Sequence, residues 1–166
     1  AMKIINSLFV FIFCMTASVF SQENVGTRSL TEFEKSFSTA IQYPEQLLER
    51  CIPTFTVMKL KFNRKGELEA LDFSDSAFPQ FVQEVLSKKE KIGFHYLYQE
   101  ALKLGKQDDW IVVPIQINTK IAGRCESTIM PYDLEHSLLF AGKPLTGKYY
   151  LYHKFIATVG IGVMYN

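Results

Sequence analysis

The stretch TFTVMKLKFNRKGELEALDFS, residues 54–74, determines the fold expected for this chain. From Met58 to Phe62 apolar and basic side chains alternate, which is the pattern of a strand with one buried and one solvated face. The segment NRKG, residues 63–66, is a turn signal, because glycine adopts a positive φ at little cost. Residues 67–74 then return as a second strand, so the stretch predicts a β-hairpin.

The returning strand carries an irregularity. Leu68 falls out of step by one residue with the later apolar pair Leu71 and Phe73. One extra residue in a strand restores a common inward face. We therefore expect a β-bulge near Ala70.

Two helices are predicted before this hairpin. Apolar residues recur at intervals of three and four from Leu30 to Ile41, and Thr31 and Glu34 have the spacing of a capping box. A short second helix, residues 45–50, follows Pro44, because proline is tolerated in a first helical turn.

Two further helices and a third strand are predicted after the hairpin. Ser76 is the expected N-cap of a helix with an apolar stripe through residues 78–86, and a helix over residues 94–104 ends at Gly105. Residues 111–117 alternate as a strand, and Pro114 cannot donate to a ladder. This strand should lie at a sheet edge or place Pro114 on its unpaired side.

The C-terminal part carries weaker signals, with strands expected over residues 149–153 and 155–164. No linker divides the chain into two cores. The fold class expected is α+β, with a short antiparallel sheet packed against helices, a helical insertion and a C-terminal β extension.

The N-terminal segment has the composition of a secretory signal peptide. Lys3 is followed by an apolar run that is shorter than the ~20 residues of a membrane span, and Val19 and Ser21 suit a cleavage site. We expect residues 2–21 to be the signal peptide and residues 22–166 to be one domain. An uncleaved anchor is the alternative. The expected location is the periplasm or the periphery of an outer membrane, with release outside the cell less favoured.

Charge and cysteine content narrow the expected partners. Cleavage removes Lys3 and leaves basic and acidic residues equal in number, which disfavours nucleic acid as a partner. Cys51 and Cys125 then remain, and an oxidising compartment favours a disulfide between them. Two separate buried thiols are the alternative.

Metal and cofactor chemistry finds little support in the residue pattern. His95, His136 and His153 lie far apart in sequence, without the spacing of paired metal ligands on a helix. We expect no metal, no cofactor and no catalytic residues. The rival site combines Asp108, Asp109 and Trp110 with the C-terminal tyrosines, which would suit a small secreted hydrolase or a ligand-binding protein.

Three motifs, taken in order, resemble the C-terminal domain of TonB-like proteins, which are exported proteins of Gram-negative bacteria. They are YPEQL at residues 43–47, RKGEL at residues 64–68 and VVPIQI at residues 112–117. The resemblance covers about residues 40–118. The long proline-rich spacer of energy-transducing TonB has no counterpart here.

The resemblance implies a small α+β domain that works by binding. In that family the third strand accepts an extended peptide by strand addition. The accepting edge here would be Ile111, Val113, Ile115 and Ile117, with Trp110 beside it. The alternative is that the C-terminal strands cover this edge.

Three functions are therefore expected from the sequence. The first is a non-enzymatic interaction module that binds another envelope protein or a peptide and meets the membrane only through that partner. The second is the hydrolase or ligand-binding protein. The third is an accessory subunit of an outer-membrane assembly, in which residues 155–164 pack against a partner.

Overall fold

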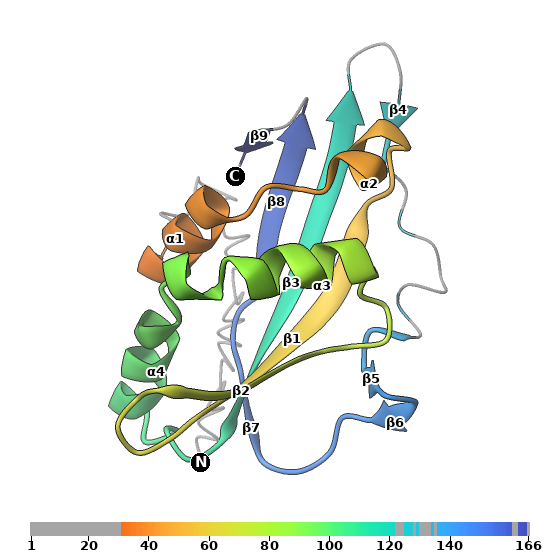
Figure 1. Ribbon diagram of the computed structural model, residues 1–166. Coiled ribbons are helices and arrows are strands. Elements are labelled where there is room, and N and C mark those ends of the chain that lie inside the picture. The colour runs from red at the N-terminus through yellow and green to blue at the C-terminus, as the bar shows by residue number, and fades with distance from the viewer. Residues whose placement is uncertain are drawn as a thin grey trace, which may run out of the picture.

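The computed structural model describes residues 31–121, 125–127, 129, 134, 136–160 and 163–165. Helices lie against one large mixed sheet, so the α+β prediction is confirmed (Figure 1). The helices are α1 (Glu32–Ala40), α2 (Glu45–Glu49), α3 (Pro79–Ser87) and α4 (Phe94–Lys103), with a 3₁₀ turn, η1 (Lys89–Lys91), between the last two.

The main sheet has the strand order β2-β1-β3-β8-β9, and β4 and β7 also pair with β3. Its strands are β1 (Thr54–Phe62), β2 (Leu68–Phe73), β3 (Trp110–Ile121), β4 (Cys125–Glu126), β7 (Tyr149–Leu151), β8 (Phe155–Gly160) and β9 (Val163–Tyr165). A separate hairpin joins β5 (Leu139–Phe140) to β6 (Lys143–Pro144). Because β7 and β8 run parallel to β3, the sheet is mixed and the prediction of a wholly antiparallel sheet is wrong.

The hairpin that determines the fold forms as predicted. β1 pairs antiparallel with β2, and the register shifts between Lys61 and Phe62, whose partners are Ala70 and Leu68. Glu69 is the extra residue of the bulge expected near Ala70. The bulge brings Leu68 back into line with the core face.

Local sequence signals also set the helix ends. Thr31 and Glu34 form the predicted capping box at the start of α1, with Oγ1 of Thr31 accepting from the Glu34 N–H at 3.2 Å. The N-cap predicted at Ser76 is wrong, because α3 begins after Phe78, which has no capping side chain. The Ser76 hydroxyl instead lies 3.0 Å from the hydroxyl of Ser74.

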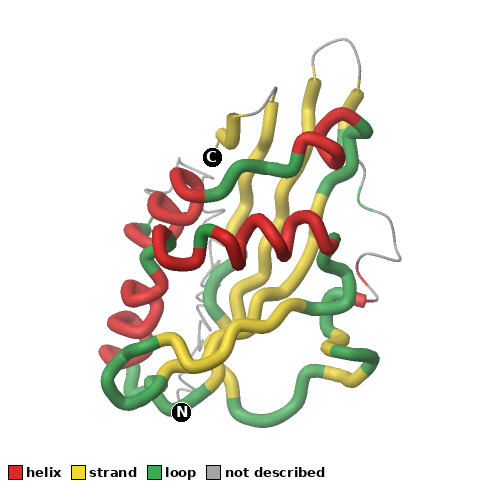
Figure 2. The backbone as a smooth tube through the Cα atoms, viewed as in Figure 1, coloured by secondary structure: helices red, strands yellow, loops and turns green. Residues whose placement is uncertain are grey.

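The helices cover one face of the sheet (Figure 2). The helices and the sheet share a single core cluster. In it the inward side chains of β1, β3 and β8 pack against Phe33 and Phe37 of α1, Phe81 and Val85 of α3, and Leu97 of α4. A second, smaller cluster lies on the opposite face, where Val57, Val112 and Phe140 meet.

β3 is an inner strand. It pairs with β1 from Ile111 to Ile117, and its other side pairs with β7 and then β8. The predicted free edge at residues 111–117 is therefore wrong, and the alternative that C-terminal strands cover it is confirmed. Phe155 and Val159 of β8 are fully buried, so this cover is part of the core.

Pro114 explains why the covering strand is broken in two. Val57, its partner in β1, directs its carbonyl to β2, where it accepts from the Ser74 N–H at 2.9 Å. Because hydrogen bonding alternates along antiparallel strands, the Pro114 nitrogen faces away from β1. It faces the interruption at residues 152–154, between β7 and β8, where no ladder donor is required. Pro114 thus lies in a central strand with its nitrogen on the side that makes no ladder bond there, which is one of the two placements expected from the sequence.

The predicted signal peptide over residues 2–21 lies outside the described residues. Within the part of the chain that is described, none of the helices has the length and apolar character needed to cross a bilayer. The pairing of Cys51 with Cys125 involves a Cys125 side chain that is not described, so the disulfide stays a prediction.

Phe155→Ala should destabilise the fold by about 3–5 kcal/mol, because removing the ring leaves a cavity in the core between α1 and β3. Phe155 is 1% exposed, and its ring centroid lies 5.1 Å from that of Phe37. Ile156→Ala is the matched control, since Ile156 is 47% exposed on the opposite face and should cost less than about 1 kcal/mol. Urea unfolding measures both. Equal losses would contradict an integral role for β8.

Tyr43 fixes the segment between α1 and β1. Its hydroxyl donates to the Ile52 carbonyl at 2.6 Å and lies 2.8 Å from the hydroxyl of Thr54. Burial raises the pKa of Tyr43 to about 12, although the hydrogen bond from Thr54 partly opposes this.

This pKa predicts a loss of stability in strong alkali. An unfolded tyrosine ionises near pH 10.0, whereas folded Tyr43 keeps its proton to about 12, so its contribution is complete below pH 10.0 and is lost as the pH rises through 12. The tyrosinate absorbance of the wild type minus that of Tyr43→Phe should rise near pH 12. A difference that rises near pH 10 would contradict this environment.

Candidate functional site

The side chains predicted to form a binding edge on β3 lie in the core. Ile111, Val113, Ile115 and Ile117 are each at most 1% exposed. Trp110 lies on the opposite face of the sheet, where the Lys59 ammonium is 4.8 Å from its ring centroid. These residues hold the fold together and offer no open strand.

An open edge lies instead along β2. In the described part of the chain, β2 pairs with β1 and with no further strand. Since the Ser74 N–H bonds to Val57 in β1, the alternation of the ladder turns the main-chain groups of Leu71 and Phe73 outward. Leu71 therefore presents both an N–H and a C=O at the edge.

Asp72 partly closes this edge. Its Oδ1 accepts from the outward N–H of Phe73 at 3.0 Å. Its other oxygen lies 3.3 Å from the Lys59 ammonium, so the carboxylate joins two neighbouring strands. The N–H and C=O of Leu71 and the C=O of Phe73 remain available to pair with a further strand.

A groove of about 680 Å³ runs between this edge and α3, and we name it the β2–α3 groove. Figure 1 shows α3 in front of β1 and β3, with β2 lower in the view. The apolar lining comes from Leu71, Phe73, Ala77, Pro79, Val82 and Leu86. The polar lining comes from Asp72, Ser74, Asp75, Gln83 and Ser87. An apolar channel beside unpaired main-chain groups has the form of an extended-peptide site.

The charge of the lining has one sign. Asp72 and Asp75 are the charged residues of the described groove lining, and no lysine, arginine or histidine is among them. Asp75 also has a structural role, because its oxygens accept from the Ala141 N–H at 2.7 Å and the Gly142 N–H at 2.6 Å.

These bonds hold the β5–β6 turn at one end of the groove. Ala141 and Gly142 both have positive φ, as a two-residue hairpin turn requires. A left-handed alanine is unfavourable on its own, and the bonds to Asp75 stabilise it.

The rival site is brought together only in part, because Trp110 of β3 pairs with Tyr149 of β7. The Asp109 carboxylate lies 3.6 Å from the Lys106 ammonium, and the Lys61 ammonium donates to the Asp108 carbonyl. Of the C-terminal tyrosines, Tyr149 is exposed, Tyr150 donates to Glu100 at 2.8 Å and Tyr152 is buried. Trp110 and Tyr149 are therefore neighbours, whereas Tyr150 and Tyr152 are held by other contacts.

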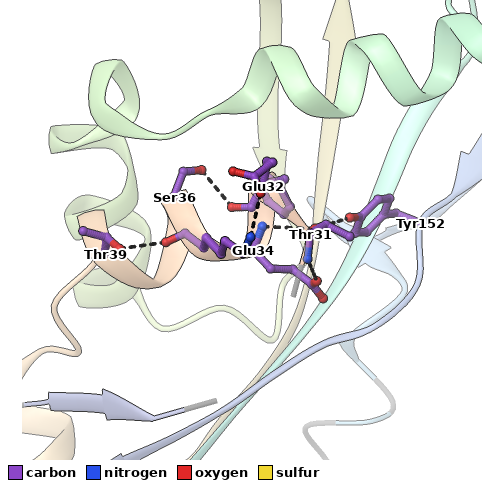
Figure 3. A network of polar contacts seen from close by, with 8 residues as sticks. Thr31, Glu32, Glu34, Ser36, Thr39 and Tyr152 are labelled. Carbon is purple, nitrogen blue, oxygen red and sulfur yellow. Dashed lines mark hydrogen bonds and ion pairs between the residues drawn. The ribbon is translucent and has the colours of Figure 1, made fainter. Parts of the chain in front are cut away.

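A polar network ties α1 to the C-terminal segment (Figure 3). The hydroxyls of Thr31 and Tyr152 lie 2.8 Å apart, and the buried Glu34 carboxylate lies 3.0 Å from Nε2 of His153. Glu34 also accepts from the Thr31 N–H at 2.7 Å, which completes the capping box. The network positions the Tyr152–Lys154 interruption against the helix start.

Among the described residues, no three histidine, cysteine or acidic side chains lie close enough to hold a metal ion. The three histidines are dispersed. The His95 ring lies 3.9 Å from that of Tyr96 at an angle of 39°, His153 faces Glu34, and His136 lies elsewhere along the chain.

No known family matches. The chain fits no protein-family model, and no curated protein and no solved structure is significantly similar to it.

Sequence reasoning missed the β2–α3 groove, although a signal for it is present. The apolar stripe of α3 includes Val82 and Leu86 beside Phe81 and Val85. Phe81 and Val85 are completely buried, whereas Leu86 is 44% exposed. An apolar stripe on a helix that is wider than core packing requires indicates a second apolar contact.

Asp75→Ala should loosen the turn that closes the groove and cost about 1 kcal/mol, because two charge-assisted bonds at an exposed site are lost. Hydrogen exchange of the Ala141 and Gly142 amides should accelerate. Asp108→Ala is the control, since Asp108 is also exposed but lies away from the groove. Unchanged exchange in Asp75→Ala would contradict the anchoring role.

Proposed function

We propose that this chain is an exported protein-interaction module that binds an extended segment of an envelope protein in the β2–α3 groove. The observation that carries the proposal is the position of an open strand edge directly beside an apolar groove. Main-chain bonds to Leu71 supply affinity, and groove contacts supply selectivity.

The order of elements supports a core like the TonB C-terminal domain. A helix, a short helix, a hairpin, a helix and a third strand follow one another, and the three strands take the order β2-β1-β3. α4 is then an insertion, and the strands after β3 are an extension. The proposed docking edge is β2, because β8 pairs with β3 where the resemblance places the peptide.

Export is part of the proposal. The N-terminal apolar run with Lys3 before it and small residues after it supports a cleaved signal. An oxidising compartment suits the expected Cys51–Cys125 pair. The strand register is compatible with this pair. Cys51 lies just before Thr54, which pairs with Ile117 of β3, and Cys125 pairs with Ile121 of the same strand.

Site-specific photocrosslinking tests the proposal in cells that export the chain. A photoreactive residue at Gln83, which is exposed on the groove wall, should crosslink to one segment of a partner protein. The same residue at Gln99, exposed on α4, is the matched control and should not capture that segment.

Leu86→Asp should reduce the Gln83 crosslink at least tenfold, because it places a charge on the apolar wall. Leu102→Asp is its control, since Leu102 is 51% exposed on α4 and a charge there leaves the groove unchanged. Crosslinks from Gln83 that persist in Leu86→Asp would overturn the docking site. So would the absence of any Gln83 crosslink.

A further inference from the structure

We infer that the segment docked in the β2–α3 groove carries an apolar side chain opposite Leu71 and a lysine or arginine next to it. This inference rests on the proposed function and specifies its ligand. It follows from the two faces of β2, from the main-chain groups left open and from the charge of the lining.

The apolar position is set by Leu71. An added strand can exchange hydrogen bonds with the outward N–H and C=O of Leu71, and the residue opposite Leu71 then projects its side chain to the same face. Leu71 lies on the face of its partner Leu60, which is the helix-covered face of the sheet. Val82 and Leu86 of α3 line the groove on that side, so an apolar side chain fits there.

The basic position follows from the alternation of a strand. Side chains on either side of the apolar one project to the opposite face, which is the face of Asp72 and its partner Lys59. The Asp72 side chain is 56% exposed, so its carboxylate is accessible to a second cation. A glutamate in the same position would meet Asp72 as a like charge.

The register of the docked segment is also restricted. Asp72 already occupies the Phe73 N–H, so Leu71 is the residue of this part of the edge with both main-chain groups available. A ligand shifted by one residue would place its apolar side chain on the polar face. The edge therefore favours a segment whose apolar side chain projects to the helix-covered face over one whose apolar side chain projects to the polar face.

Lys59 modulates this selectivity. Its ammonium lies 3.3 Å from Asp72 and is also 4.3 Å from the Phe140 ring centroid and 4.8 Å from that of Trp110. It competes with a ligand cation for the same carboxylate. Removing Lys59 and removing the charge of Asp72 should therefore have opposite effects, although both break the same ion pair.

The experiment measures binding of the full mature chain to three synthetic peptides by fluorescence anisotropy. Each peptide has a Thr-Val background with one leucine, followed by lysine, glutamine or glutamate. The lysine peptide should bind about fivefold more tightly than the glutamate peptide at low salt, and the ratio should shrink at high salt. Replacing the leucine by serine should abolish binding.

Two variants separate ligand recognition from loss of fold. Asp72→Asn keeps an oxygen for the Phe73 N–H and should reduce the lysine-to-glutamate ratio to nearly one. Lys59→Gln should increase that ratio, because it frees the carboxylate. A ratio that falls in both variants would overturn the role of Asp72.

The remaining outcomes distinguish this inference from the proposed function. Equal binding of the three peptides overturns the basic position and leaves a peptide site in the groove. Failure of every peptide to bind overturns the extended-peptide ligand, while crosslinking from Gln83 reports independently whether a protein docks there.

Discussion

The pairing of β3 on both sides is the constraint on which the rest of the structure depends. β1 takes one side, and β7 and β8 take the other in parallel register. The inward side chains of β1, β3 and β8 form one apolar face of the sheet, and α1, α3 and α4 pack against this face. Because parallel neighbours cannot be joined by a tight turn, β7 and β8 come from a segment well separated from β3 in the sequence.

This arrangement determines where the sheet stays open. Among the described strands, β2 and β9 are the outermost members, and the helix layer reaches β2 through α3. Phe73 packs on Phe81 with centroids 6.3 Å apart, which fixes the inner wall of the groove. The groove thus forms because α3 follows β2 after a short connection and residues of both elements line it.

The sequence predicted what depends on neighbouring residues. The hairpin, the bulge at Glu69 and the capping box at Thr31 each follow from residues a few positions apart. The cover of β3 by β7 and β8 could not be predicted, because it joins segments about forty residues apart and Pro114 suited both an edge and an unpaired side. The groove was missed because Val82 and Leu86 share the helical spacing of the core residues Phe81 and Val85.

An open edge needs protection from unselective pairing, and Asp72 supplies it by holding the Phe73 N–H and an ion pair to Lys59. A segment without a compensating charge must approach the exposed Asp72 carboxylate without offering it a partner. A segment with a cation in the right position gains the carboxylate as a partner and the apolar wall as a contact surface. In the docking that we propose, the residue that disfavours unselective strand pairing also favours a ligand with a cation in this position.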